Sequence, residues 1–237
     1  MILRKETFDQ TNGLAMLELR GESFELAVFL HGEPLLYDAS DCMGSVGRFM
    51  VLLPSTQSLS AQMQIEANAK LGFSLDEPLQ DQLSPLLQLL PNGSYRLLLE
   101  EIEQYEVLDW SYGSRSETGW VMGYYAEYNY ADSQALLTTQ PSSNLSDERV
   151  NFYIAQIESG VRPALIGLSS KLLSEATFVI DGRHKLQAYV RTGVAPHVLR
   201  IEFEQTTSIS NDLAHQILKD VEGGDVRNYL QTKERSL

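Results

Sequence analysis

Hydrophobic residues in the first 55 positions occur in short runs that glycine and proline separate. The runs fall at 14–19, 24–30, 35–37 and 49–53. Short apolar runs with turn residues between them are typical of an antiparallel meander of strands. We therefore expect the N-terminal part of the chain to be rich in β-structure.

The pattern changes to a helical one after the last of these runs. Good helix formers fill 58–71, which ends at Gly72, and 83–90, which ends at a Pro-Asn-Gly turn. Both segments predict helices. Residues 95–105 combine leucines with strong helix formers and fit either a helix or a strand.

A second change of character suggests where domains divide. The stretch 110–130 interleaves aromatic residues with glycines, and it fits either a ligand-stacking surface or the half-buried face of strands. Polar and turn-forming residues at 136–147 then predict a linker. We accordingly expect a β-rich N-terminal region of unknown function over 1–140 and a C-terminal core over 147–237.

From Ser146 onwards, predicted helices and strands alternate. Ser146 is expected to cap a helix that Gly160 ends, because its hydroxyl can accept a backbone N–H and acidic residues follow in the first turn. Strands are predicted at 164–168, 178–180 and 196–203, and helices at 186–192, which Gly193 ends, and at 211–219. The sequence thus predicts an α+β protein: a β-rich N-terminal part with mixed helices, followed by an α/β core.

The net charge of −14 is unevenly distributed along the chain. An acidic protein is poorly suited to broad nucleic-acid binding, because neutralising phosphates needs a positive surface. Residues 161–203, however, carry a net charge of +3, so the rest of the chain carries −17. This basic segment indicates a local anion site, although a stretch that is merely poor in acids would give the same count.

Composition also limits the protein's environment. The single cysteine, Cys42, excludes an internal disulfide and a cysteine-rich zinc site. No apolar run approaches the roughly 20 residues that a membrane span needs, and the first residues lack the apolar core of a signal peptide. We expect a cytoplasmic protein without a membrane partner. The four histidines are scattered without metal-ligand spacing, so no metal site is predicted.

The candidate chemistry lies where the strand at 178–180 turns into the helix at 186–192. The turn reads Asp181-Gly182-Arg183-His184-Lys185. Such a turn directs backbone N–H groups at whatever lies beyond it, and glycine permits a close approach. Arg183 and Lys185 could donate charge-assisted hydrogen bonds, His184 could donate or relay a proton, and Asp181 could bind a metal, act as a base or cap the helix.

A purely structural interpretation of the same residues stays open. Asp-Gly is an ordinary turn dipeptide, and Asp before a helix is an ordinary N-cap. His184 could be a packed histidine, and Lys185 and Arg191 could belong to a solvated helix face.

The order of elements and the turn together resemble the core of the ParB/sulfiredoxin-like superfamily. The matching pieces are a helix leading to Gly160-Val161-Arg162-Pro163, a strand, a second strand ending in Asp181-Gly182, the basic turn, a helix with Ala188, Gly193 and a closing strand. The resemblance covers about a quarter of the chain. It implies that the turn serves as a phosphate cradle for nucleotide binding or phosphoryl transfer.

Three departures limit what the resemblance implies. The turn lacks the cysteine that sulfiredoxins use, so sulfinic acid reduction is not expected. Lys185 stands where the family usually has arginine, and lysine gives up bidentate phosphate geometry. The 34 residues after Phe203 are too few and too acidic for the helix-turn-helix of chromosome-partitioning relatives.

Two hypotheses follow, and whether the protein is an enzyme stays open between them. In the first, a bacterial cytoplasmic protein binds a phosphate-bearing ligand, namely a nucleotide with or without Mg²⁺, and phosphoryl transfer or nucleotide hydrolysis could accompany binding. Arg162, Gly182, Arg183 and Lys185 would hold phosphate, and Asp181 and His184 would be catalytic. In the second, the fold is kept without catalysis, and the acidic body engages a basic protein partner as toxin-immunity proteins or inhibitors do.

Overall fold

The computed structural model describes most of the chain. The described residues are 1–22, 24–40, 47–53, 73, 76–108, 110, 114–116, 119–125, 134–139 and 145–235. The helix predicted at 58–71, Cys42 and much of the aromatic stretch 110–130 lie outside the described residues.

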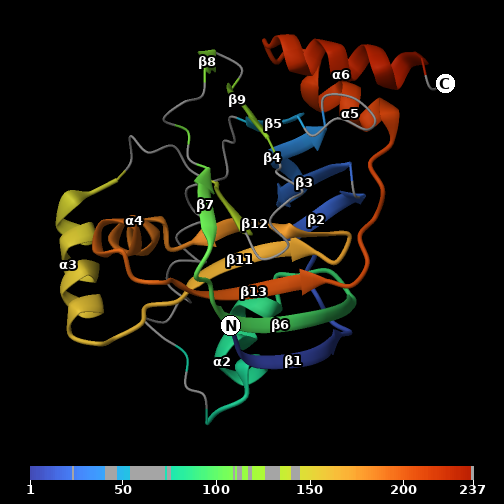
Figure 1. The fold of residues 1–237 in the computed structure, drawn as a ribbon. Coiled ribbons are helices and arrows are strands. Elements are labelled where there is room, and N and C mark those ends of the chain that lie inside the picture. The colour runs from blue at the N-terminus through green and yellow to red at the C-terminus, as the bar shows by residue number, and fades with distance from the viewer. Residues whose placement is uncertain are drawn as a thin grey trace.

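The described strands form two sheets (Figure 1). The first, sheet A, is mixed, and its strand order is β1 (Ile2–Gln10), β6 (Gly93–Glu101), β13 (His197–Phe203), β11 (Leu165–Ser170), β12 (Leu173–Asp181), β10 (Gln134–Thr138) and β7 (Tyr105–Leu108). The second, sheet B, is antiparallel, in the order β2 (Leu17–Glu22), β3 (Glu25–Leu30), β4 (Glu33–Ser40), β5 (Gly47–Leu52), β9 (Gly119–Tyr125) and β8 (Ser114–Ser116). With the helices, this architecture confirms the predicted α+β class.

Sheet A crosses the domain boundary that the sequence suggested. Strands β1, β6, β7 and β10 precede residue 140, whereas β11, β12 and β13 follow it. The linker prediction is wrong for 136–138, since these residues belong to β10, which pairs with both β12 and β7. A local pattern identifies a strand or a turn but does not tell which sheet the strand joins.

The C-terminal helices cover the sheet formed by the N-terminal part of the chain. α5 (Asn211–Leu218) and α6 (Gly224–Arg235) lie over sheet B in Figure 1. Ala214, Leu218 and Val226 share one buried cluster with Phe29 and Phe49 of sheet B. The two halves of the chain therefore complete each other's cores.

Several predicted elements are confirmed with shifted ends. The segment 95–105, which fits either a helix or a strand, overlaps strand β6, and the helix predicted at 83–90 corresponds to α2 (Leu79–Leu87). In the C-terminal part, α3 (Asp147–Glu158) begins after its N-cap Ser146, as expected. α4 (Arg183–Thr192) starts three residues before the predicted start at 186, so the basic turn lies inside its first turn.

Helices α3 and α4 pack against each other at one end of sheet A, where the candidate site lies (Figure 1). Leu186 of α4 packs on Leu136, Leu165, Val179 and Val198 of sheet A. The opposite face of sheet A contributes Leu97, Leu199, Ile201 and Phe203 to the large core shared with sheet B and α2. This packing fixes the start of α4 relative to the end of β12.

The start of α2 is capped by a carboxylate from a distant strand. Glu6 of β1 accepts hydrogen bonds from the backbone N–H groups of Leu79, at 3.0 Å, and Gln80, at 3.2 Å. Burial opposes ionisation of Glu6, but these two bonds and the neighbouring Arg4 together lower its pKa. Because the pKa of Glu6 is lower in the folded state, ionised Glu6 stabilises the fold. This stabilisation is complete above the unfolded pKa of the carboxyl group and is lost as the pH falls through its folded pKa.

We expect Glu6→Ala to lower the free energy of unfolding at pH 7 by about 1 kcal/mol, the usual value of an N-cap. Urea denaturation at pH 7 and at acidic pH would measure the change, with Glu22→Ala, an exposed carboxylate at the end of β2, as the control. The difference in the free energy of unfolding between Glu6→Ala and the unmutated protein should shrink at acidic pH. A difference that stays constant with pH would show that the charge of Glu6 does not act as a cap.

Candidate anion-binding site

The 181–185 turn joins the end of β12 directly to the start of α4. Gly182 is the N-cap residue and has a φ of 104°, a left-handed conformation that favours glycine. A Cβ atom at this position would lie 2.9 Å from Cδ2 of Leu165, so the close packing also requires glycine. As a glycine, this N-cap residue has no side chain with which to accept the first N–H groups of α4.

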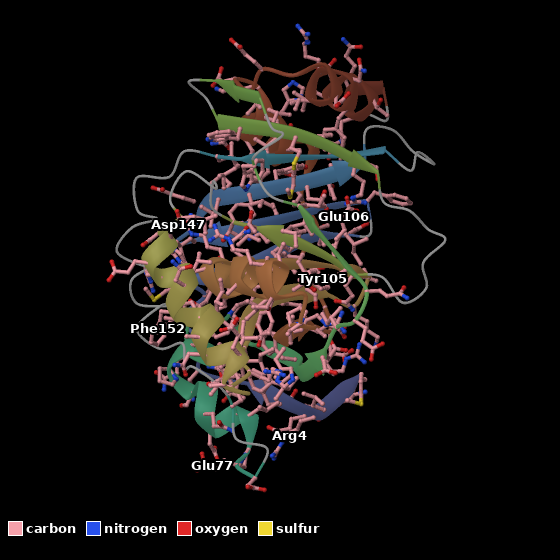
Figure 2. The ribbon with its side chains drawn as sticks, turned by 60° about the vertical axis from the view of Figure 1, so that its left-hand side comes forward. Arg4, Glu77, Tyr105, Glu106, Asp147 and Phe152 are labelled. Atoms are coloured by element: carbon pink, nitrogen blue, oxygen red, sulfur yellow. The ribbon has the colours of Figure 1, made fainter. Side chains whose placement is uncertain are left out.

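A pocket lies at this turn, between α4 and the N-terminal part of α3. In Figure 2, Asp147 marks the N-terminal end of α3, which lies in front of α4. The pocket is small, with a volume of about 20 Å³. Its lining residues are Thr139, Arg149, Tyr153, Val179, Ile180, Asp181, Gly182, Arg183, His184 and Lys185. The whole predicted turn thus lines one small pocket.

His184 is a neutral hydrogen-bond donor in this pocket. His184 is only 8% exposed, and its Nε2 atom accepts a hydrogen bond from the backbone N–H of Ser146 at 3.1 Å. Since Nε2 is the acceptor, the neutral ring carries its proton on Nδ1. Burial, then the positive charges of Arg183 and Arg149, lower the pKa of His184 to about 4. At neutral pH it can donate from Nδ1, whereas Nε2 is already occupied.

Lys185 lines the pocket and is bonded to two acceptors of the protein itself. The residue is 3% exposed, and Nζ donates to Oδ2 of Asp181 at 2.8 Å and to the carbonyl oxygen of Ala164 at 3.0 Å. A buried ammonium group needs such partners, because its desolvation is costly. Lys185 therefore offsets the charge of Asp181 at the wall of the pocket.

Arg162, predicted as a phosphate contact, is not among the described residues that line this pocket. Its Nη1 donates to the carbonyl oxygens of Ile157, at 3.0 Å, and Val161, at 3.1 Å. These groups lie at the C-terminal end of α3, whereas the pocket lies at its N-terminal end. A 12-residue helix separates the two ends by about 18 Å.

Arg149 is a charged lining residue that the sequence pattern did not indicate. It lies in the first turn of α3, and both its guanidinium group and that of Arg183 depress the pKa of His184. The available signal was its position three residues after the N-cap Ser146. Arg149 was overlooked because it precedes the basic segment 161–203 in the sequence, although the fold brings it to the turn.

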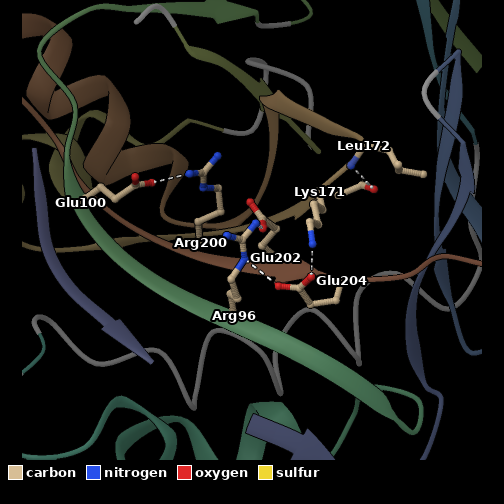
Figure 3. Close-up of polar contacts among 8 residues, drawn as sticks. Arg96, Glu100, Lys171, Leu172, Arg200, Glu202 and Glu204 are labelled. Atoms are coloured by element: carbon tan, nitrogen blue, oxygen red, sulfur yellow. Dashed lines mark hydrogen bonds and ion pairs between the residues drawn. The ribbon is translucent and has the colours of Figure 1, made fainter. Parts of the chain in front are cut away.

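Most of the positive charge in that basic segment is neutralised by ion pairs. Figure 3 shows two such groups on neighbouring strands of sheet A. Arg200 pairs with Glu100 at 3.0 Å, and Lys171 pairs with Glu204 at 2.8 Å, while Arg96 joins Glu202 and Glu204. Arg191 pairs with Asp147 at 2.9 Å. The charge count of the segment therefore overstated its positive surface, and the pocket is the place where positive side chains converge.

The chemistry of the lining favours an anion. Three side chains of the lining, those of Arg149, Arg183 and His184, carry hydrogen-bond donors, and a helix N-terminus adds a favourable dipole. In the part of the chain that the structure describes, no three His, Cys, Asp or Glu residues are grouped as metal ligands. None of the described helices is both long and apolar enough to cross a membrane.

The fold and the pocket define an α+β protein with a donor-rich pocket where a strand of a mixed sheet turns into a helix. No protein-family model, no curated protein and no solved structure matches the chain. The function is therefore inferred from the chemistry of the pocket.

Proposed function

We propose that this chain is a bacterial cytoplasmic protein that binds a phosphate-bearing ligand, in the first place a nucleotide, at the 181–185 turn. The observation that carries the proposal is the convergence of Arg149, Arg183 and His184 on one pocket at the start of α4. Charge-assisted hydrogen bonds from arginine and backbone N–H groups are the usual means of holding phosphate. The resemblance of the 147–203 segment to the ParB/sulfiredoxin-like superfamily points to the same ligand class.

The geometry supports binding better than phosphoryl transfer or hydrolysis. Both candidate bases are engaged within the protein: Nε2 of His184 accepts from Ser146, and the carboxylate of Asp181 is ion-paired with Lys185 through Oδ2, which leaves only Oδ1 for a ligand. Mg²⁺ is usually held by one or two carboxylates together with substrate phosphates. Asp181 is the carboxylate among the described lining residues, and Lys185 already offsets its charge. We therefore expect ligand binding that does not depend on Mg²⁺.

A thermal-shift and calorimetric titration series tests the proposal. The ligands are inorganic phosphate, ATP, ADP, CTP and GTP, each with and without Mg²⁺. A ligand at about one hundred times its dissociation constant should add roughly 2.7 kcal/mol to the stability. We expect Arg149→Gln and Arg183→Gln each to weaken binding about tenfold or more, in line with a lost charge-assisted hydrogen bond.

The matched control is Arg227→Gln, which removes the same charge from an exposed position of α6. It should leave the dissociation constant unchanged. Equal weakening by Arg149→Gln and Arg227→Gln would mean that only the overall charge matters, and the pocket would lose its support as the binding site.

One observation favours the second hypothesis, an interaction protein that keeps the fold without catalysis. The buried ion pair between Asp181 and Lys185 satisfies two of the predicted functional groups within the protein itself. An acidic body of this kind would engage a basic protein partner, and the complex would weaken with rising salt. If no phosphate or nucleotide binds, capture of a basic partner at low salt, lost at high salt, is the expected result.

A further inference from the structure

Asp181 places a hydrogen-bond acceptor among the donors of the pocket. Its Oδ2 atom receives the hydrogen bond from Lys185 at 2.8 Å, and the residue also lines the pocket. Oδ1 is the carboxylate oxygen that this bond leaves for a ligand. A carboxylate oxygen only accepts hydrogen bonds, so it attracts a ligand atom that carries a proton and repels one that carries only negative charge.

The position of Asp181 is fixed by its surroundings. Lys185 holds it from one side, and the backbone of β12 holds it from the other, where Asp181 pairs with Ile166 of β11. The carboxylate side chain is only 9% exposed, so it cannot turn away into solvent without losing a buried ion pair. A ligand in the pocket must therefore bind next to the carboxylate of Asp181.

We propose that Asp181 makes the pocket selective for an oxyanion that retains a proton, so that it takes hydrogen phosphate or a singly protonated phosphate monoester and rejects sulfate. The inference rests on the proposed function, because it specifies which anion the same pocket holds. The donors of the pocket satisfy the unprotonated oxygens of hydrogen phosphate, and its P–O–H group donates to Oδ1. Sulfate has the same shape but no proton at neutral pH, so one of its oxygens would face Oδ1 without a hydrogen bond.

Calorimetric titration of the unmutated protein with phosphate, arsenate and sulfate at pH 7 and constant ionic strength tests the proposal directly. Arsenate carries a proton as phosphate does. We expect phosphate and arsenate to bind alike and sulfate to bind at least tenfold more weakly, the size expected for one hydrogen bond to a charged group. Equal binding of sulfate and phosphate would overturn the selectivity but leave anion binding intact. Binding of none of the three would instead contradict the proposed function.

A phosphate monoester distinguishes binding of an esterified phosphate from binding of free hydrogen phosphate. Phenyl phosphate loses its last proton near pH 6, whereas inorganic phosphate keeps one at neutral pH. Its affinity should fall between pH 5.5 and 7.5 by more than that of inorganic phosphate. An affinity of the monoester that is unchanged over this range would contradict a requirement for the proton.

Asp181→Asn tests the residue itself. Lys185 would still donate to the amide oxygen of the asparagine, so the amide NH₂ group would face the pocket as a donor. We expect the preference for phosphate over sulfate to fall to about threefold or less. The readout is a ratio of affinities, which a general loss of stability would not change, and the ion series on the unmutated protein stands even if this variant fails to fold. A ratio that stays at tenfold in the folded variant would remove Asp181 as the selective residue.

Discussion

Replacing Lys185 with methionine is expected to lower the free energy of unfolding by about 3–5 kcal/mol, the usual cost of breaking a buried ion pair by removing one partner. The ammonium group of Lys185 is buried against Oδ2 of Asp181 and the carbonyl oxygen of Ala164. Methionine can fill much of the space but leaves the carboxylate of Asp181 buried without its counter-charge. Urea denaturation at pH 7 would measure the loss.

Two further variants show whether the charge or the packing is responsible. Asp181→Asn combined with Lys185→Met should recover much of the stability, because it removes both charges from the same buried position. Lys171→Met removes a lysine from a similar pair with Glu204, but its side chain is 55% exposed, and its cost should stay below about 1 kcal/mol. A loss in Lys185→Met as small as that in Lys171→Met would mean that the pair at the turn contributes little to folding.

The strands and helices near the site could be predicted because their signals are local. In β13 the hydrophobic side chains of Leu199, Ile201 and Phe203 alternate with Arg200 and Glu202, and the predicted strand is found there. By contrast, β1 was missed because the charged run Arg4-Lys5-Glu6 obscures its alternation. The membership of β1 in sheet A depends on pairing with β6, some 90 residues later, which no local pattern encodes.

The site could be predicted only in part, for the same physical reason. The turn itself was identified from Asp181-Gly182 and the basic residues after it, all within five positions. The contacts that decide their roles come from elsewhere: Ser146 donates to His184 across 38 residues, and Ala164 accepts from Lys185 across 21. Asp181 and Lys185 are four positions apart, but Asp181 ends β12 and lies outside α4, so helix spacing alone does not predict their ion pair.

The stability of the protein should fall as the pH drops from about 6.5 to about 4, and His184 should cause part of the fall. Its pKa is lowered to about 4 in the folded state, first by burial and then by Arg183 and Arg149, whereas an unfolded histidine titrates near 6.5. In this range the unfolded chain takes up a proton that folded His184 does not. The free energy of unfolding therefore decreases as the pH falls, by up to about 3 kcal/mol and less where salt screens the two arginines.

His184→Gln isolates this contribution, because glutamine can still accept the N–H of Ser146 but does not titrate. Urea denaturation at several pH values should give a shallower slope for this variant than for the unmutated protein between pH 6.5 and 4. His215→Gln, which removes a more exposed histidine of α5, is the control. Parallel curves for His184→Gln and the unmutated protein would mean that folded His184 takes up its proton over the same pH range as an unfolded histidine. Burial and the two arginines would then not lower its pKa, and the hydrogen bond from Ser146 would be lost in that range, because a protonated ring cannot accept it.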